Sequence, residues 1–216
     1  MKKLLKKNLP VPAFELLKKT YYLTLRTRYK FFGRPRTQGE TTTAKPRRLR
    51  EGFFEKFCVG NGLDIGYGGD LVVQNCVGFD YEDGDAQYLR KFGDEEFDFV
   101  YSSHTLEHMV DVETSLHNWW RVLKQGGFLI VYIPHRDLYE KKKTLPSNWN
   151  SDHKHFFLPE SDDPPDTIGV RPLLDRMFPD HEIIYILECS EGCTITDPNI
   201  HSNGEYSIEF VVKKSF

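Results

Sequence analysis

Residues 62–70, with the sequence GLDIGYGGD, combine a short apolar segment with a cluster of glycines. This order predicts a buried strand that ends in a tight turn. Glycines directly after a strand let the chain leave the sheet sharply and let a ligand approach the backbone closely. The pattern therefore favours the binding of a nucleotide-type cofactor at the end of the strand.

The residues that follow the turn distinguish between cofactors. A dinucleotide site has the pattern Gly-x-Gly-x-x-Gly/Ala, with an acid about 20 residues further on. Gly66 and Gly68 fit this pattern, but Leu71 stands at the third position. The strand-end acid, Asp80, lies much closer, where it would accept both ribose hydroxyls of an adenosine. Acidic surroundings also suit a cationic sulfonium better than a pyrophosphate, which favours S-adenosylmethionine.

Histidines are concentrated in segments that we expect at the carboxyl edge of a sheet, where open α/β folds bind their ligands. They are His104, His108, His135, His153 and His155. A general base accelerates transfer to a hydroxyl by roughly 10²–10⁴-fold, so His104, His153 and His155 are catalytic candidates. The alternative for His104 is a strand-end hydrogen bond, and for His108 it is packing. The two loop histidines alternatively fasten their loop.

Metal-ligand spacing is weak in this sequence. His104 and His108 lie four residues apart, but no Glu in a zincin position accompanies them. The four cysteines are Cys58, Cys76, Cys189 and Cys193. Only the last two are close together, and no second pair has zinc-site spacing. We therefore expect no metal, and reduced thiols in a cytoplasmic protein.

Helix and strand patterns alternate along the chain and predict an α/β fold. Helices are expected over residues 12–32, 47–57, 112–124 and 171–178, and strands over 63–65, 76–80, 97–101, 128–133, 182–187 and 206–213. Together they indicate a Rossmann-like, doubly wound, mostly parallel sheet closed by a C-terminal antiparallel strand pair. The long polar segment over 135–170 is typical of a lid or binding loop, and 33–46 of a linker.

Six segments in order resemble the class I S-adenosylmethionine-dependent methyltransferases of the methyltransferase domain 11 type. They are LDIGYGGD (63–70), VGFD (77–80), GDAQYL (84–89), EFDFVYSSHTLEH (96–108), RVLKQGG (121–127) and FLIVYIPHRD (128–137). One departure is the short connection after Gly68, which leaves a loop or one helical turn where the family has a full helix. A similar short form occurs in the group associated with bacterial surface-polysaccharide biosynthesis.

The resemblance implies roles for particular residues of this chain. Those near the cofactor are Asp64, Gly66, Tyr67, Gly68, Asp80, Tyr81, Asp85, Ala86, Ser102 and Ser103. The glycine turn would line the methionine part, Asp80 the ribose, and Asp85 with Ala86 the adenine. Ser102 and Ser103, with His104, would lie near the sulfonium and the acceptor. For Asp64, orienting the turn through backbone hydrogen bonds is an equal alternative, and for Asp85 a role in the turn.

The expected activity is methyl transfer from S-adenosylmethionine to an oxygen of a sugar or polysaccharide precursor. A first alternative is a methyltransferase on another small metabolite. A second is a non-catalytic, methyltransferase-like scaffold in glycan assembly, which the contracted connection after the turn keeps open. A small molecule or glycan is the expected partner, and the oligomeric state stays open.

Charge divides the chain into a basic arm, residues 1–50, and an acidic methyltransferase domain, 51–216. The arm has fifteen Lys and Arg against two acids, about +13, which leaves 29 − 15 = 14 basic and 32 − 2 = 30 acidic residues, about −16, for the rest. The arm's helix is interpreted as a solvated face, a peripheral membrane contact or a lid over the cofactor. Nucleic acid is not expected, since no recognised motif accompanies the charge. The basic start lacks the apolar run of a signal peptide, and no stretch is long enough to span a membrane.

Overall fold

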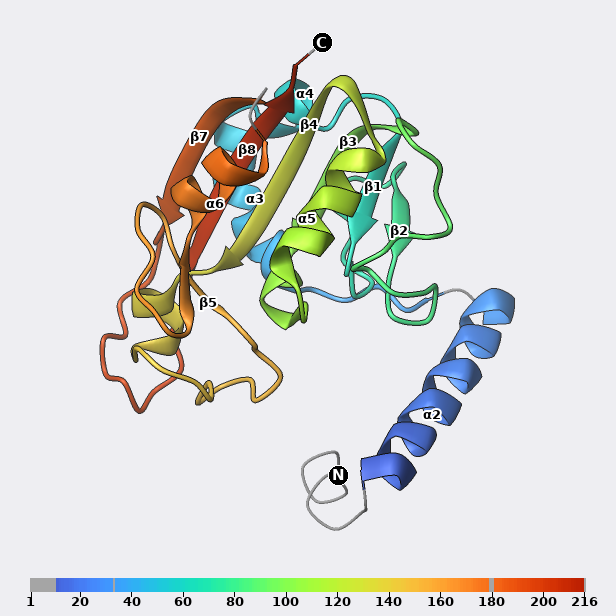
Figure 1. The fold of residues 1–216 in the computed structure, drawn as a ribbon, viewed down its shortest axis with the longest axis horizontal. Coiled ribbons are helices and arrows are strands. Elements are labelled where there is room, and N and C mark those ends of the chain that lie inside the picture. Colours follow the sequence, from blue (N-terminus) through green and yellow to red (C-terminus); the bar gives the residue numbers. More distant parts are fainter. Residues whose placement is uncertain (1–10, 33, 179–180, 216) are drawn as a thin grey trace.

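The computed structural model describes residues 11–32, 34–178 and 181–215. Its centre is a six-stranded sheet in the order β2-β1-β3-β4-β8-β7 (Figure 1). The strands are β1 (Gly62–Ile65), β2 (Val77–Phe79), β3 (Phe97–Ser103), β4 (Leu123–Pro134), β7 (His181–Cys189) and β8 (Ser207–Lys214). Strands β1 to β4 run parallel, whereas β8 is antiparallel to both β4 and β7. The predicted fold class, with its antiparallel closing pair, is confirmed.

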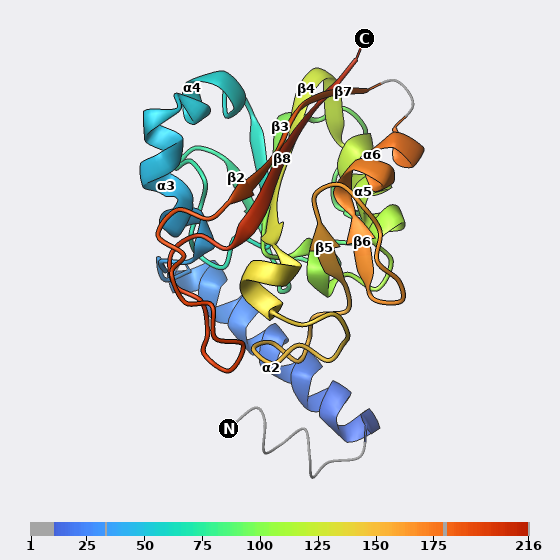
Figure 2. The same cartoon turned by 90° about the vertical axis from the view of Figure 1, so that its left-hand side faces the viewer.

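Helices cover both faces of the sheet (Figure 2). One face carries α3 (Glu40–Arg50) and α4 (Phe53–Phe57), and the other carries α5 (Val112–Arg121) and α6 (Val170–Met177). Successive residues of β3 therefore serve different cores. Phe99 and Tyr101 pack with Phe53, whereas Val100 packs in the cluster that holds Trp119. A sheet covered on both faces explains why the strands are nearly continuous apolar runs in the sequence.

The structure corrects the prediction for residues 33–57. We expected a linker over 33–46 and one helix over 47–57, but α3 already begins at Glu40. The helical path is broken at Gly52, whose φ of 65° only glycine adopts readily. Strand β4 begins at Leu123, five residues earlier than predicted, and α5 ends at Arg121 instead of 124. The other predicted helices and strands are found within two residues of their predicted ends, and the short pair β5 (Phe156–Leu158) and β6 (Thr167–Gly169) was not predicted.

Helix α3 is held on the sheet by buried charge, which hydrophobic periodicity does not detect. Arg48 is fully buried and donates to Glu209 at 2.7 Å and to the Tyr101 hydroxyl at 2.8 Å. Arg47 bonds Glu205 and Glu209 from the next position. Residues 40–50 of the predicted basic arm thus pack directly on the sheet.

The long basic helix α2 (Val11–Phe32) stands away from the sheet (Figure 1). Its Tyr22 ring stacks on Tyr81 of the loop after β2, with ring centroids 3.9 Å apart. The basic run at 1–7, examined above for a signal sequence, lies outside the described residues. Among the helices described, none is both long enough and apolar enough to cross a membrane. All four cysteines are free thiols, as predicted.

Two connections shape the carboxyl edge of the sheet. Residues 66–76 join β1 to β2 without a helix, as the short spacing predicted. Residues 135–170 hold the one-turn π-helix η2 (Arg136–Glu140) and the separate parallel pair β5 (Phe156–Leu158) and β6 (Thr167–Gly169). The bridge between His135 and Phe157 places this segment directly beside the end of β4.

Candidate functional site

The glycine turn after β1 has the backbone geometry that the sequence predicted. Gly66 has a φ of 73°, and a Cβ there would lie 1.9 Å from Oγ1 of Thr105. Its N–H donates to the carbonyl of Phe79 at 2.7 Å, which ties the turn to the end of β2. Gly68 has a φ of 60°, and the nearest atom to a Cβ there would be a backbone oxygen 3.9 Å away. The space next to Gly66 is thus filled by Thr105, whereas the space next to Gly68 is open.

Asp80, the predicted ribose ligand, lies directly beside this turn. Its Oδ2 accepts the Gly68 N–H at 2.9 Å, and its Oδ1 accepts the Tyr81 N–H at 2.6 Å. The same Oδ2 lies 2.9 Å from Nη1 of Arg34, and both side chains are 18% exposed. A carboxylate offers about four acceptor positions, so three are engaged and one is left.

The segment that follows α2 lies over the turn. Arg34 also contacts Glu82 at 2.6 Å, and its guanidinium lies 4.8 Å from the centre of the Tyr67 ring. Thr37 donates from its hydroxyl to the Gly68 carbonyl at 2.9 Å and from its N–H to the Gly69 carbonyl at 3.2 Å. The part of the basic arm next to Arg34 therefore lies directly on the turn at which the cofactor is predicted to bind; the lid remains a prediction.

Asp64 is fully buried beneath the turn. Its Oδ2 accepts the Val72 N–H at 2.7 Å, and burial raises the pKa of this carboxyl to about 8. With no exposed surface it fastens the loop over 66–76, so the orienting role is favoured over cofactor contact. Ser102 is also fully buried and donates to the Ile65 carbonyl at 3.1 Å, which joins the ends of β1 and β3.

The remaining predicted cofactor residues lie along the carboxyl edge of the sheet and differ in exposure and in their contacts. Tyr81 is 53% exposed and stacks on Tyr22. Asp85 is exposed and accepts the N–H of Gln87, which agrees with the predicted role in the turn. Its predicted contact with adenine remains a prediction. Ala86 packs against the main core. The hydroxyl of Ser103 is buried and has no hydrogen-bond partner among the described residues.

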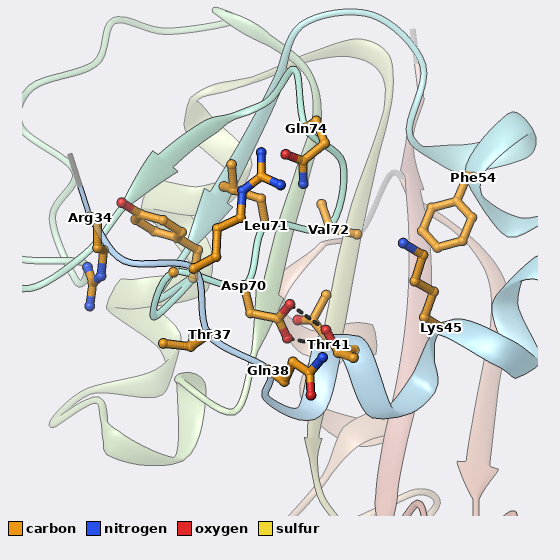
Figure 3. Close-up of a pocket in the computed structure, with 14 residues that line it drawn as sticks. Arg34, Thr37, Gln38, Thr41, Lys45, Phe54, Asp70, Leu71, Val72 and Gln74 are labelled. Carbon is orange, nitrogen blue, oxygen red and sulfur yellow. Dashed lines mark hydrogen bonds between the residues drawn. The ribbon is translucent and has the colours of Figure 1, made fainter.

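A cavity of about 700 Å³ adjoins the turn on its other side (Figure 3). It lies between residues 34–45 and 67–74, beside the connection that joins β1 to β2 without a helix. Arg34 and Lys45 line it, and Asp70 in its wall accepts the N–H and hydroxyl of Thr42 at 2.9 and 2.6 Å. Of the ten predicted cofactor residues only Tyr67 reaches this cavity, so the cavity neighbours the predicted cofactor position without coinciding with it.

His104 lies at the end of β3, between the turn and the acceptor side. Its φ of 48° is unusual for a residue with a side chain, and its Nε2 lies 2.9 Å from the Ser207 hydroxyl. Burial, with the nearby His153 and His108, lowers the pKa of His104 to about 3. A base this weak takes a proton from a hydroxyl poorly. The structure therefore favours the strand-end hydrogen bond over the catalytic role that we predicted.

A buried carboxylate, Glu107, gathers three of the predicted histidines. Its Oε1 lies 3.8 Å from Nδ1 of His104, 3.8 Å from Nε2 of His108 and 3.8 Å from Nε2 of His153. His153, in the long segment, is itself buried and bonds Glu140 at 2.6 Å. His155 does not join them, because its ring lies against the backbone of Met109 and Val110.

The chain is similar to known proteins in both sequence and fold. Residues 63–131 match the family model described as Methyltransferase domain (Methyltransf_11). A search of curated proteins finds no match. Among solved structures, an Archaeoglobus fulgidus SAM-dependent methyltransferase is 18% identical with a TM-score of 0.51, covering 90% of this chain and all of that one (100%). The [4+2]-cyclase SpnF is 14% identical with a TM-score of 0.51, covering 91% and 94%.

A third similar structure is a complex between the Haloferax volcanii Trm112 methyltransferase activator and the putative methyltransferase. It is 11% identical with a TM-score of 0.51, covering 82% of this chain and 95% of that one. The chain has the class I methyltransferase fold. The family match and this fold support S-adenosylmethionine as the cofactor.

The residues at the ends of β1 and β2 have the chemical groups that this cofactor needs. The open backbone at Gly68 allows close approach, and Asp80 has one acceptor position left for a ribose hydroxyl. A second position becomes available when Arg34 turns away to Glu82, which it already contacts. When bound, the cofactor supplies an electrophilic methyl group on a sulfonium.

Several residues of this edge escaped the sequence analysis. Glu107 and Glu140 contact the two ring nitrogens of His153. Tyr139, Tyr206 and His201 pack against one another as a group of aromatic rings beside them. Only Glu107 had a local signal, since it follows a strand and precedes a histidine. The others come from segments that only the folded chain brings together.

Proposed function

We propose that this protein transfers a methyl group from S-adenosylmethionine to a hydroxyl of a sugar or polysaccharide precursor. The observation that carries the proposal is the order of groups along the carboxyl edge of the sheet. The glycine turn and Asp80 lie at the ends of β1 and β2, and the histidine cluster begins at the end of β3. Thr105 bridges the two, because its hydroxyl contacts the Ile65 carbonyl at 3.3 Å beside the turn.

The chain contributes positioning and proton removal. Alignment of the acceptor with the methyl group supplies roughly 7–11 kcal/mol of the barrier. As the acceptor oxygen bonds to the methyl carbon, the sulfur–carbon bond breaks and the hydroxyl proton has to leave. With a pKa of about 3, His104 holds that proton poorly. This leaves the group formed by Glu107, His108 and His153 to assist the acceptor.

The surroundings of this group support a glycan acceptor. Tyr139, Tyr206 and His201 present ring faces with polar tips, and Trp149 packs on His201 with centroids 5.4 Å apart. Such amphipathic rings suit a ligand that has both apolar faces and hydroxyls. A small metabolite with an apolar body is the competing acceptor, and a scaffold without activity is the competing function.

Calorimetry with S-adenosylmethionine and S-adenosylhomocysteine is the test. We expect micromolar binding that is lost in Asp80→Ala and kept in Asp175→Ala, which removes an exposed carboxylate on α6. Methyl transfer to a panel of nucleotide sugars, followed with radiolabelled cofactor, then tests the acceptor class. Folded protein that binds neither ligand would overturn the methyltransferase function and favour the scaffold. Transfer confined to non-sugar metabolites would overturn the acceptor class alone.

We also propose that α2 contacts the surface of an anionic membrane. Leu16, Leu23 and Phe31 are 66, 63 and 74% exposed and share one side of the helix by their spacing. Arg26 and Arg28 lie between them, an arrangement typical of interfacial helices. Co-sedimentation with vesicles of anionic phospholipid should be lost in Leu16→Ser with Leu23→Ser. Equal sedimentation of this variant, or none of the wild type, would contradict the proposal.

A further inference from the structure

Three side chains converge on one point at the acceptor side of the sheet edge. Glu107 and His108 follow β3, and His153 comes from the long segment after β4. One ligand atom of each lies within 4.8 Å of the other two. Four bonds of about 2.0–2.2 Å around a tetrahedral ion separate its ligands by about 3.4 Å. The observed 3.8 Å from Glu107 to each histidine is close to that spacing and too long for a direct hydrogen bond.

The burial of the Glu107 carboxylate supports a cation at this point independently of the spacing. Glu107 is fully buried, and within the described part of the chain neither of its carboxylate oxygens accepts a hydrogen bond from another residue. A buried ionised carboxylate without such partners is strongly destabilising unless a cation lies next to it. A cation at the point where the two histidines meet Glu107 would compensate the burial of this carboxylate.

The histidines are oriented to present lone pairs rather than protons to that point. Nδ1 of His153 bonds Oε1 of Glu140 at 2.6 Å, and Nδ1 of His108 lies 3.3 Å from the carbonyl of Asp152. Carboxylate and carbonyl oxygens accept, so Nδ1 carries a proton in each ring, and in the neutral histidine Nε2 then presents its lone pair to the shared point. A carboxylate or carbonyl behind a histidine is the usual support of a metal ligand.

We propose that Glu107, His108 and His153 bind a divalent transition-metal ion of the zinc type, with one position open to a substrate oxygen. Two imidazoles and one carboxylate suit such an ion better than Mg²⁺, which prefers oxygen ligands. Of the three residues only His108 is appreciably exposed, at 24%, so a substrate oxygen would approach the ion from its side. His104 does not belong to the group of mutually close ligand atoms, although its Nδ1 also lies 3.8 Å from Oε1 of Glu107.

The role of the ion in catalysis rests on the proposed function, whereas its binding does not. A bound divalent ion lowers the pKa of an oxygen ligand. An acceptor hydroxyl at the open position would release its proton to water at the exposed edge of His108. Its oxygen would then form the bond to the methyl carbon as the sulfur–carbon bond breaks. His153 then acts as a ligand, and no histidine base is needed.

Metal binding is tested on the full chain after treatment with a chelator and dialysis. Titration with Zn²⁺ by calorimetry should give one ion per chain, and Co²⁺ should develop visible absorption. The near-isosteric Glu107→Gln should weaken binding more than about 100-fold, and Glu140→Gln about 10–100-fold. His117→Gln removes an exposed histidine of α5 and should leave binding unchanged.

Stability provides a readout that a purely structural role would not produce. Without metal, Glu107→Gln should melt at or above the wild-type temperature, because it removes a buried carboxylate that accepts no hydrogen bond among the described residues. With Zn²⁺, the wild type and His117→Gln should gain stability, whereas Glu107→Gln should not. No binding by the wild type, or equal binding by Glu107→Gln, would overturn the site. S-adenosylmethionine titrated into the same proteins tests the proposed function separately, since its failure leaves the metal result standing.

Discussion

We expect Arg34 to compete with the cofactor for Asp80, the predicted ribose ligand, so its removal should strengthen cofactor binding. Asp80 needs two acceptor positions for the two ribose hydroxyls, and with Arg34 in contact it has one. Binding therefore requires that Arg34 leave Oδ2. In Arg34→Ala this step is absent, and the affinity for S-adenosylmethionine should rise.

The magnitude follows from the exposure of the pair. Exposed ion pairs stabilise by about 0.2–1 kcal/mol, and these two side chains are each only 18% exposed, which places the contact towards the upper end. Arg34 keeps its 2.6 Å contact with Glu82 when it moves, which limits the cost. We expect a gain of about 0.5–1 kcal/mol, or about a two- to fivefold lower Kd.

The assay is calorimetric titration at two ionic strengths, with Arg26→Ala as the control. Arg26 lies exposed on α2 and its loss changes the net charge equally. Salt weakens a partly exposed ion pair, so higher ionic strength should improve binding by the wild type and not by Arg34→Ala. Weaker binding by Arg34→Ala would refute this reasoning, because it would mean that Arg34 holds the cofactor itself.

Three further changes test the framework of the site. Arg48→Ala leaves Glu209 buried without its main partner and should lower the free energy of unfolding in urea by about 3–5 kcal/mol. Arg48→Met combined with Glu209→Leu should cost much less, and equal losses would contradict the ion-pair argument. Gly66→Ala brings Cβ to 1.9 Å from Thr105 Oγ1 and should abolish cofactor binding, a result that unchanged binding would refute. The pKa of Asp64 is raised to about 8, so between roughly pH 5 and 8 the folded chain keeps a proton that the unfolded chain releases. Stability should therefore fall as pH rises, by up to about 1.4 kcal/mol per unit, and an equally steep fall in Asp64→Asn would contradict this cause.

Local patterns predicted the parts of the site that one segment builds by itself. The glycine turn and Asp80 belong to consecutive strands, and their spacing alone indicated both the turn and the short connection. The closing strands over 182–187 and 206–213 were likewise evident from alternation. These features could be predicted because each depends on a few neighbouring residues and on the regular geometry of strands.

Long-range polar contacts were not predictable in the same way. Arg34 and Asp80 are 46 residues apart, and the ligands of the proposed metal centre span residues 107–153. A charged residue carries no periodic signal that indicates its partner, so the sequence analysis placed Arg48 in the basic arm without a partner on the sheet. The histidines were recognised by type, but only the fold separated His155 from the cluster and brought Glu107 into it.

The contracted connection after the turn has a structural consequence for the N-terminal segment. In the absence of a helix after Gly68, the backbone of the turn is held by residues 37–42 instead. Thr37 bonds the carbonyls of Gly68 and Gly69, and Asp70 accepts the N–H groups of Gly39 and Thr42, each at 2.9 Å. The segment that stabilises the cofactor turn is therefore the same segment that places Arg34 on Asp80. A movement of the arm backbone that withdraws Arg34 from Asp80 should therefore also strain these bonds to the turn, whereas rotation of the Arg34 side chain alone should not.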